Sequence, residues 1–291
     1  MEDDDGLMVP DYLCVEKREF QYTRSYCEEN IYKFVEQLLP RLPPEAQCFV
    51  VFISNPNKTI PIWNHRSEGI DEDSNPSDDD DDDDDGVDSQ QPSQSQQSSY
   101  SSSSSSSAPP PGYEDISDDE DGPMGRDGDA VIVWDYHVIC VVKPKRADCV
   151  AWIFDFDSDM DFPSPAPEYS VYCLGIQYEL PKKYEHRFRM IAAKSFLDNF
   201  ASDRRHMKDE ETGEWVAQPP SYAPVRGSLS KEAHNLPLYM NTELLPAPQA
   251  PASALLDRPA FFKWIGVKTD LIRPKDDDDG DDDDHESDEP L

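Results

Sequence analysis

Cys27 lies where the sequence predicts that a helix begins. Ser25 and Glu28 have the spacing of a capping box, and Pro40 ends the segment. The first turn of a helix offers unpaired N–H groups and a partial positive charge, which favour thiolate over thiol. A cysteine there can be a nucleophile, although a lone helical cysteine is more often a packed thiol. The helix is predicted from one apolar face, formed by Ile31, Phe34, Val35, Leu38 and Leu39.

A histidine could serve this cysteine as a base. The segments 130–142 and 149–157 are rich in β-branched and aromatic residues, so we expect two strands of a hairpin. With the turn midway between them, His137 lies opposite Phe154 or Asp155. The spacing supports a catalytic histidine and a histidine merely satisfied by hydrogen bonds about equally.

Two aspartates could orient this histidine. Side chains alternate along a strand, so Asp155 and Asp157 share one face, as do Asp135 and His137. A carboxylate beside an imidazole fixes its tautomer and stabilises the imidazolium. With Cys27 this gives a Cys-His-Asp triad, in which the spacing does not separate Asp155 from Asp157.

The sequence gives little support for other chemistry. Asp155 begins an alternating acidic run, but Met160 and Ala166 occupy the positions where a calcium-binding EF-hand requires Gly and Glu. No dinucleotide-binding glycine motif, P-loop or G-x-S-x-G elbow is present. We therefore expect no metal and no organic cofactor. The remaining histidines have no ligand spacing with each other or with cysteine: His65, His186, His206, His234 and His285.

Further elements must position these residues. Segments 48–54 and 59–63 flank a turn at 55–57 and are predicted to form a hairpin. Segment 186–193 is a predicted strand, and 195–201 starts a helix. A helix followed by antiparallel strands indicates an α+β domain.

Most of the charge lies outside these elements. The formal net charge is −36, and residues 2–5, 67–129 and 276–291 carry 36 of the 62 acidic side chains. Such segments cannot bury enough apolar surface to offset their ordering entropy. We expect one catalytic domain over 1–275, interrupted by a disordered acidic and serine-rich insert at 67–129 and followed by a disordered tail. We expect the insert and the tail only to keep the chain solvated. The alternative is that they bind a basic partner or that Ser117 is phosphorylated.

Composition also bounds location and partners. No Lys/Arg-rich block suggests nucleic-acid binding, and no apolar run approaches the roughly 18–20 residues of a membrane span. The acidic N-terminus has no apolar signal core. The six cysteines contain no C-x-x-C pair, which favours free thiols in a reducing compartment. We expect a monomer in the cytoplasm, or in both the cytoplasm and the nucleus, without membrane or nucleic-acid partners.

Several blocks of the chain resemble the eukaryotic protein N-terminal glutamine amidohydrolases. Together they cover about 26–66 and 130–224, and several uncommon blocks in one order are more specific than a single motif. The resemblance implies a papain- or transglutaminase-like cysteine hydrolase, with the nucleophile at a helix N-terminus packed on a mainly antiparallel sheet. The blocks are Tyr26–Asn30, Val51–Asn55, Ile60–Trp63, Trp134–Val138, Phe154–Asp157, Phe188–Ile191 and Asn199–Asp209, followed by Trp215 and Pro219–Pro224.

The family motifs imply a triad of Cys27, His137 and Asp155, and they select Asp155 over Asp157. The implied reaction converts an N-terminal glutamine of a protein or peptide to glutamate and releases ammonia through a thioester on Cys27. No cofactor takes part. The product would enter an arginylation-dependent degradation route.

Recognition of a free α-ammonium group requires a nearby acceptor. Glu28, Glu29 and Asp135 are candidates because they adjoin the triad motifs. Glu28 has a competing role as the capping partner, and Asp135 could simply support His137. Four residues of a matched block could line the substrate site or brace the fold: Ser202, Asp203, Arg204 and His206.

Rival functions use the same features. A papain-like protease or a transglutaminase would share the triad chemistry, and a non-enzymatic adaptor would use the acidic segments to bind basic partners. The chain departs from the family in the insert between Trp63 and Trp134 and in the poor match after Pro224. Neither departure touches a triad motif, so the expected activity stands.

Overall fold

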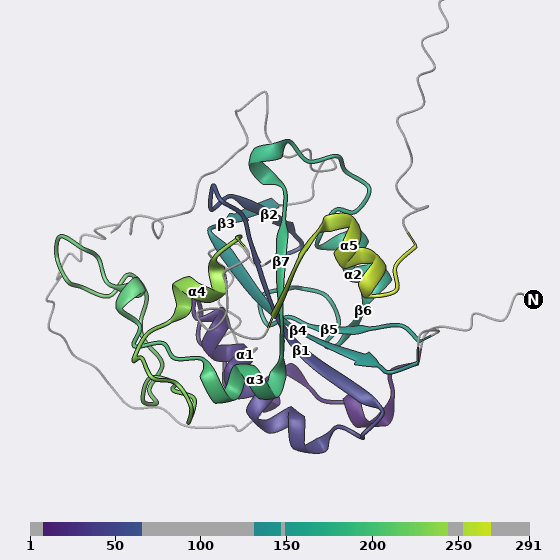
Figure 1. Cartoon of the computed structure of the whole chain (residues 1–291), viewed down its shortest axis with the longest axis horizontal. Coiled ribbons are helices and arrows are strands. Elements are labelled where there is room, and N and C mark those ends of the chain that lie inside the picture. The colour runs from purple at the N-terminus through teal and green to yellow at the C-terminus, as the bar shows by residue number, and fades with distance from the viewer. Residues whose placement is uncertain (1–7, 66–130, 147–148, 244–252, 269–291) are drawn as a thin grey trace, which may run out of the picture.

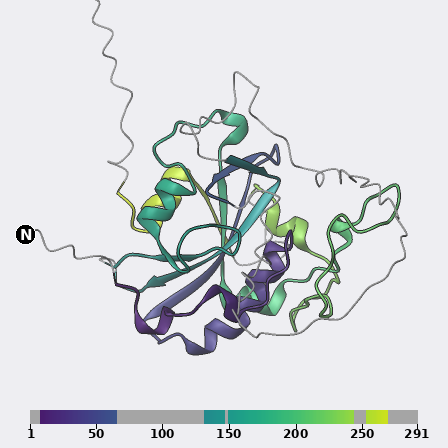
Figure 2. The same ribbon diagram turned by 180° about the vertical axis from the view of Figure 1, so that it is seen from behind.

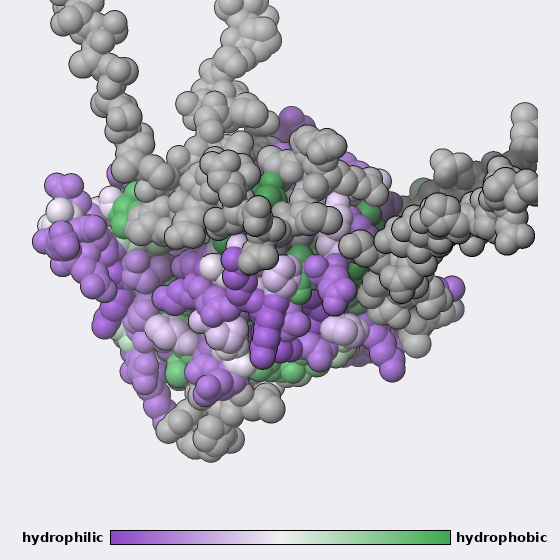
Figure 3. Space-filling view, turned by 90° about the horizontal axis from the view of Figure 1, so that it is seen from above, coloured by the Kyte–Doolittle hydropathy of each residue, from purple (hydrophilic) through white to green (hydrophobic). Residues whose placement is uncertain are grey.

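The computed structural model describes residues 8–65, 131–146, 149–243 and 253–268 (Figure 1). The segments predicted to be disordered, the insert at 67–129 and the tail at 276–291, lie outside these residues. Within the described part, no helix has the length and apolar character needed to cross a membrane. Viewed from above, hydrophilic side chains dominate the coloured surface and apolar ones are scattered among them (Figure 3).

The main sheet has six strands in the order β6-β5-β4-β1-β7-β8, and every neighbouring pair is antiparallel. A second sheet pairs two short antiparallel strands, β2 and β3. Together with the helices, these sheets confirm an α+β architecture with a mainly antiparallel sheet. The strands are β1 Ala46–Ser54, β2 Ile60–Trp63, β3 Val131–Trp134, β4 Tyr136–Pro144, β5 Trp152–Phe154, β6 Ser164–Pro165, β7 Arg187–Ala192 and β8 Ser253–Asp257.

Helices cover both faces of the main sheet (Figures 1 and 2). The α-helices are α1 Cys27–Leu38, α2 Ala166–Tyr172, α3 Ala193–Asn199, α4 Leu236–Met240 and α5 Arg258–Trp264. Short 3₁₀ turns span Asp11–Leu13, Lys17–Glu19, Leu39–Arg41, Lys182–Tyr184 and Arg205–Met207.

The central strand β1 shows why two helical layers are needed. Val50 and Phe52 pack into the cluster that contains residues of α1, α3 and α4, whereas Val51 and Ile53 pack with residues of α2 and α5. Successive side chains of a strand point to opposite faces, so a strand covered on both sides becomes a continuous apolar run. The sheet therefore holds α1 on one face and α2 on the other.

The predicted hairpin of 48–54 and 59–63 is wrong. Both strands exist, but β1 pairs with β4 and β7, whereas β2 pairs with β3. The Asn55 side chain replaces a tight turn: its Oδ1 accepts hydrogen bonds from the N–H groups of Asn57 and Thr59, and its Nδ2 donates to the carbonyl of Thr59. This loop leads the chain out of the main sheet.

The predicted strand 130–142 is two strands in two sheets. The chain bends at Asp135, whose Oδ1 accepts a hydrogen bond from the N–H of Tyr136 at 2.9 Å. The next strand pairs in a different register from the predicted one, because Phe154 lies opposite Cys140 and not opposite His137. Asp155 follows Phe154, the last residue of β5 that pairs with β4, so it lies just beyond the paired part of the strand.

The predicted strand at 186–193 is confirmed as β7, and the helix that follows begins at Ala193, earlier than expected. This helix is α3.

Candidate active site

The backbone before α1 presents Cys27 at the first helical residue. The predicted capping box is wrong, because the N-cap residue is Tyr26 and no side chain of the described residues caps the helix. Ser25 has a left-handed φ of 65°. The turn is fixed instead by Asn30, whose amide accepts from the N–H of Thr23 and donates to its carbonyl, both at 2.8 Å.

The Cys27 thiol is buried and lies among acids. Burial raises its pKa well above the usual value, and the charge of Glu28 adds to this, as do Asp157 and Asp135. The thiol donates toward Glu28 Oε2 at 3.8 Å, and a hydrogen bond from the backbone N–H of Val138 to the sulfur acts in the opposite direction. The helix N-terminus favours thiolate over thiol, but burial and the nearby carboxylates act in the opposite direction and raise the pKa of the thiol. A base must remove the proton when the thiol reacts.

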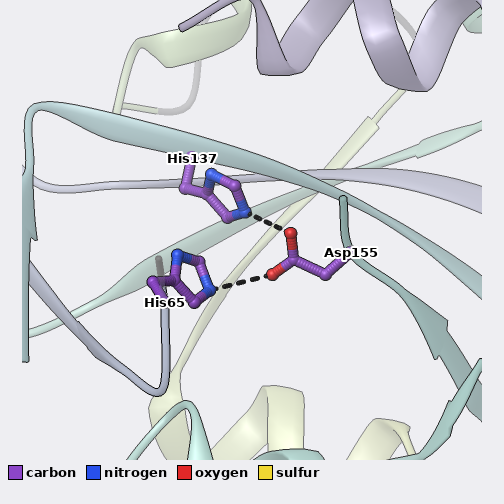
Figure 4. A group of neighbouring side chains, drawn as sticks. All are labelled: His65, His137 and Asp155. Atoms are coloured by element: carbon purple, nitrogen blue, oxygen red, sulfur yellow. Dashed lines mark hydrogen bonds and ion pairs between the residues drawn. The ribbon is translucent and has the colours of Figure 1, made fainter. Parts of the chain in front are cut away.

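The imidazole of His137 is fully buried against a carboxylate (Figure 4). His137 Nε2 lies 2.9 Å from Asp155 Oδ1, whereas His137 Nδ1 lies 4.0 Å from Asp157 Oδ2. Burial lowers the pKa of His137, but the Asp155 charge and hydrogen bond outweigh it and the net shift is upward. Geometry therefore separates the two aspartates and makes Asp155 the partner of this ring.

Asp155 has further partners that the sequence did not indicate. The Tyr169 hydroxyl donates to Oδ2 at 2.5 Å, and the N–H of Asp157 donates to Oδ1 at 3.0 Å. His65 Nε2 lies 3.0 Å from Oδ2 (Figure 4). Burial raises the pKa of Asp155, but the two histidines reverse this and hold it well below the usual value. Tyr169 belongs to α2 and His65 follows β2, so no local spacing could have revealed either contact.

Glu28 forms a second polar centre beside the thiol. Its side chain is fully buried, and Oε2 accepts a hydrogen bond from the Tyr136 hydroxyl at 2.9 Å. His206 Nε2 lies 3.3 Å from Oε1, an oxygen without a hydrogen-bond donor among the described residues. Asp135 is mostly shielded as well, and burial is the main reason that its pKa is raised. Both acids lie close enough to the sulfur to raise its pKa.

Glu29 has a different environment. Its two carboxylate oxygens accept hydrogen bonds from Arg204 Nε and Nη2, each at 2.8 Å. Arg204 also donates to the carbonyls of Pro220 and Tyr222, both at 3.0 Å. This buried ion pair ties α1 to the segment after α3, so Arg204 braces the fold, whereas His206 from the same block faces Glu28.

Comparison with known proteins identifies relatives of most of the described region. Residues 22–75 and 121–247 match the family model of N-terminal glutamine amidase. Protein N-terminal glutamine amidohydrolase of Arabidopsis thaliana is 31% identical over 216 residues, which cover 73% of this chain and 72% of that protein. The proteins of the same name from Drosophila willistoni and Drosophila melanogaster are each 27% identical over 219 residues, covering 75% of this chain and 78% of their own length. The matched ranges include all three residues of the candidate triad.

Proposed function

The chain belongs to the N-terminal glutamine amidase family and is a hydrolase that acts on the amide of N-terminal glutamine, and we propose that Cys27, His137 and Asp155 perform this reaction through a thioester. The observation that carries the proposal is the buried 2.9 Å contact between His137 and Asp155. Asp157 links this pair to the nucleophile, because it lies 4.0 Å from the His137 ring and its charge acts on Cys27.

Acylation starts from a protonated thiol. Nε2 of His137 forms a hydrogen bond with Asp155. The buried Nδ1 of the same ring has no hydrogen-bond partner among the described residues and can accept the thiol proton. The sulfur of Cys27 attacks the side-chain carboxamide carbon, and the Cys27 N–H at the helix start stabilises the oxyanion. His137 then gives its proton to the nitrogen, ammonia leaves, and a γ-glutamyl thioester remains.

Deacylation uses the same residues in reverse order. His137 takes a proton from water, whose oxygen attacks the thioester carbon, and the thiol leaves with that proton. Asp155 holds the ring orientation and stabilises the imidazolium in both halves. The products are N-terminal glutamate and ammonia, and no step requires a cofactor.

Glu28 and Asp135 are the proposed acceptors for the substrate's α-ammonium group. Glu28 Oε1 is buried, lies 3.3 Å from His206 Nε2 and accepts no hydrogen bond from the described residues, so a bound ammonium would complete its hydrogen bonding. A substrate without this positive charge leaves the acceptor unpaired, which penalises internal and acetylated glutamines. Glu29 already accepts two hydrogen bonds from Arg204, which favours a structural role for it.

A peptide with N-terminal glutamine, its N-acetylated copy and an internal-glutamine peptide test the function. We expect ammonia release from the free peptide alone, loss of turnover in Cys27→Ala, and a mass increase of the enzyme in acid-quenched samples from the thioester. Cleavage of the peptide backbone would instead indicate a protease, and incorporation of an added amine a transglutaminase. Glu28→Gln should raise KM for the free peptide more than it lowers kcat.

The family match is interrupted between residues 75 and 121, which supports one catalytic domain with an insert. We propose that a chain lacking 67–129 keeps its turnover. The reaction would also feed degradation, since N-terminal glutamate is a substrate for arginyl transfer and glutamine is not. A reporter protein with N-terminal glutamine should therefore be longer-lived in cells that carry only the Cys27→Ala enzyme.

A further inference from the structure

His65 is a buried histidine that the proposed reaction does not use. Its side chain is inaccessible to solvent, and neither ring nitrogen has a well-aligned hydrogen bond within the described residues. It nevertheless lies 3.0 Å from Asp155 Oδ2, and its ring centroid is 4.8 Å from that of His137 (Figure 4). A buried polar ring without an aligned partner requires an explanation.

His65, His137 and Asp155 form a compact set of metal-binding atoms. One ligand atom from each lies within 4.8 Å of the other two, and all three side chains are buried. Zinc binds imidazole nitrogen and carboxylate oxygen at about 2.0–2.2 Å, so ligand atoms on one ion are roughly 3.4 Å apart. His137 Nε2 lies 2.9 Å from Oδ1 of Asp155, and His65 Nε2 lies 3.0 Å from Oδ2. The limit of 4.8 Å on the separations within one set of three ligand atoms includes the spacing that zinc requires.

We propose that His65, His137 and Asp155 form a Zn²⁺ site. Two imidazoles and one carboxylate are a donor set that suits zinc and leaves a fourth position open. The spacing of the histidines in the sequence gave no metal motif, because the three ligands come from separate segments that only the fold brings together.

Neighbouring groups fit the requirements of bound metal. The Tyr169 hydroxyl already orients Asp155 by donating to Oδ2. When His137 Nε2 binds an ion, its Nδ1 must carry the proton, and Asp157 Oδ2 at 4.0 Å is an acceptor within reach of a small ring movement. Such outer partners of metal-binding histidines fix their tautomer and orientation. The charge of the Asp157 carboxylate, 4.0 Å from the His137 ring, also attracts a cation.

Occupation of the site has a consequence that rests on the proposed function. Zinc would use His137 Nε2 and an oxygen of Asp155, which are the atoms joined in the proposed triad. The bound ring could no longer exchange protons with Cys27 in the triad geometry. Zinc is therefore expected to inhibit turnover reversibly, and chelation to restore it.

Zinc affinity of the chelator-treated full-length chain tests the site. ZnSO₄ is titrated against a competing chromophoric chelator, with wild type, His65→Leu, Cys27→Ala and, as a matched control, His234→Gln. His65→Leu should weaken binding at least about ten-fold, since the loss of outer-shell partners alone costs about 10–100-fold. Cys27→Ala and His234→Gln should bind as wild type does. The acidic segments are the same in every variant, so they cannot produce this difference.

Cobalt spectra provide a second measurement on the unaltered chain, which also covers the case in which His65→Leu does not fold. Nitrogen and oxygen ligands give d–d bands without a thiolate charge-transfer band. A charge-transfer band, or zinc binding that is lost in Cys27→Ala and kept in His65→Leu, would overturn the site by moving the ion to the thiol. Binding that depends on His65 but does not inhibit ammonia release would support the site and refute the triad.

Discussion

Replacement of Asp155 by asparagine, compared with the same change at Asp157, tests the assignment of the acid in the proposed triad. The two aspartates stand two residues apart and both adjoin His137. Asp155 accepts from Nε2 at 2.9 Å, whereas Asp157 is 4.0 Å from Nδ1 and accepts a hydrogen bond from the Tyr22 hydroxyl at 2.6 Å. The pair of variants therefore changes the same chemical group in two positions that differ in geometry.

The size of the effect follows from the contact that is lost. A hydrogen bond to a charged group contributes about 1.5–3 kcal/mol, which corresponds to roughly 10- to 150-fold in rate. Loss of tautomer control adds to this, since the equivalent change in a serine protease costs about 10⁴-fold. We expect Asp155→Asn to lower kcat/KM for an N-terminal glutamine peptide by about 10²- to 10⁴-fold, and Asp157→Asn by less than about 10-fold.

The pH dependence of kcat/KM tests the direction of the pKa shift of His137, whatever the size of the rate loss. Burial lowers the pKa of His137, but Asp155 raises it by more, so the neutral base forms only above the usual range. Removal of the Asp155 charge should move the acid limb of kcat/KM to lower pH. Ammonia release between pH 5 and 9 measures this shift for both variants.

The free energy of unfolding should also depend on pH, because the pKa values of His137 and Asp155 differ between the folded and unfolded states. The raised pKa of His137 stabilises the fold below its unfolded value of about 6.5, and this contribution is lost as the pH rises through the folded value. The lowered pKa of Asp155 stabilises the fold above about 3.9, and this contribution is lost as the pH falls toward the folded value. The destabilisation by Asp155→Asn in urea unfolding should therefore be larger at pH 5 than at pH 9. An acid limb that stays in place, or a greater loss of activity in Asp157→Asn, would refute this assignment.

Two further predictions concern the scaffold, and denaturant unfolding measures both. Glu29→Gln leaves the buried Arg204 guanidinium without its charge partner, so it should lower the free energy of unfolding by about 3–5 kcal/mol; a loss below about 1 kcal/mol would mean that Glu29 is free for substrate. Gly175→Ala places a Cβ 2.7 Å from the Trp63 ring at a φ of +55°, so it should cost about 1–3 kcal/mol from overpacking beyond the backbone cost. Gly213→Ala, with a φ of +72° and open space around the new atom, isolates that backbone cost, and an equal loss in both variants would contradict the packing argument.

The elements of the fold are largely predictable because their signals are local. The apolar face of α1 and the apolar runs of β1, β4 and β7 depend on periodicity over a few residues, and the structure contains them. The family of the chain is equally accessible, since its motifs are short blocks in a fixed order. That the acidic insert at 67–129 is disordered stays a prediction from its composition.

Strand pairing was not predictable, because the residues of a strand do not specify which other strand it pairs with. Segments 48–54 and 59–63 look like a hairpin, but Asn55 closes a different loop and the second strand joins another sheet. The register of His137 was not predictable for the same reason: the spacing allowed Phe154 or Asp155 opposite it, whereas Phe154 lies opposite Cys140 and the His137 side chain contacts Asp155 beyond the end of the paired residues. Side-chain direction follows from period two, whereas register depends on the turn and on contacts across the sheet.

By itself, the sequence determined which residue types are present and, through the family motifs, which cysteine, histidine and aspartate to examine. The tertiary structure decided their environment. Burial and the charges of Glu28, Asp157 and Asp135 raise the pKa of Cys27. Asp155 contacts two histidines, and both carboxylate oxygens of Glu29 bind Arg204. Desolvation, ion pairing and metal-binding geometry all depend on distances between residues that are far apart in the chain, and folding alone fixes those distances.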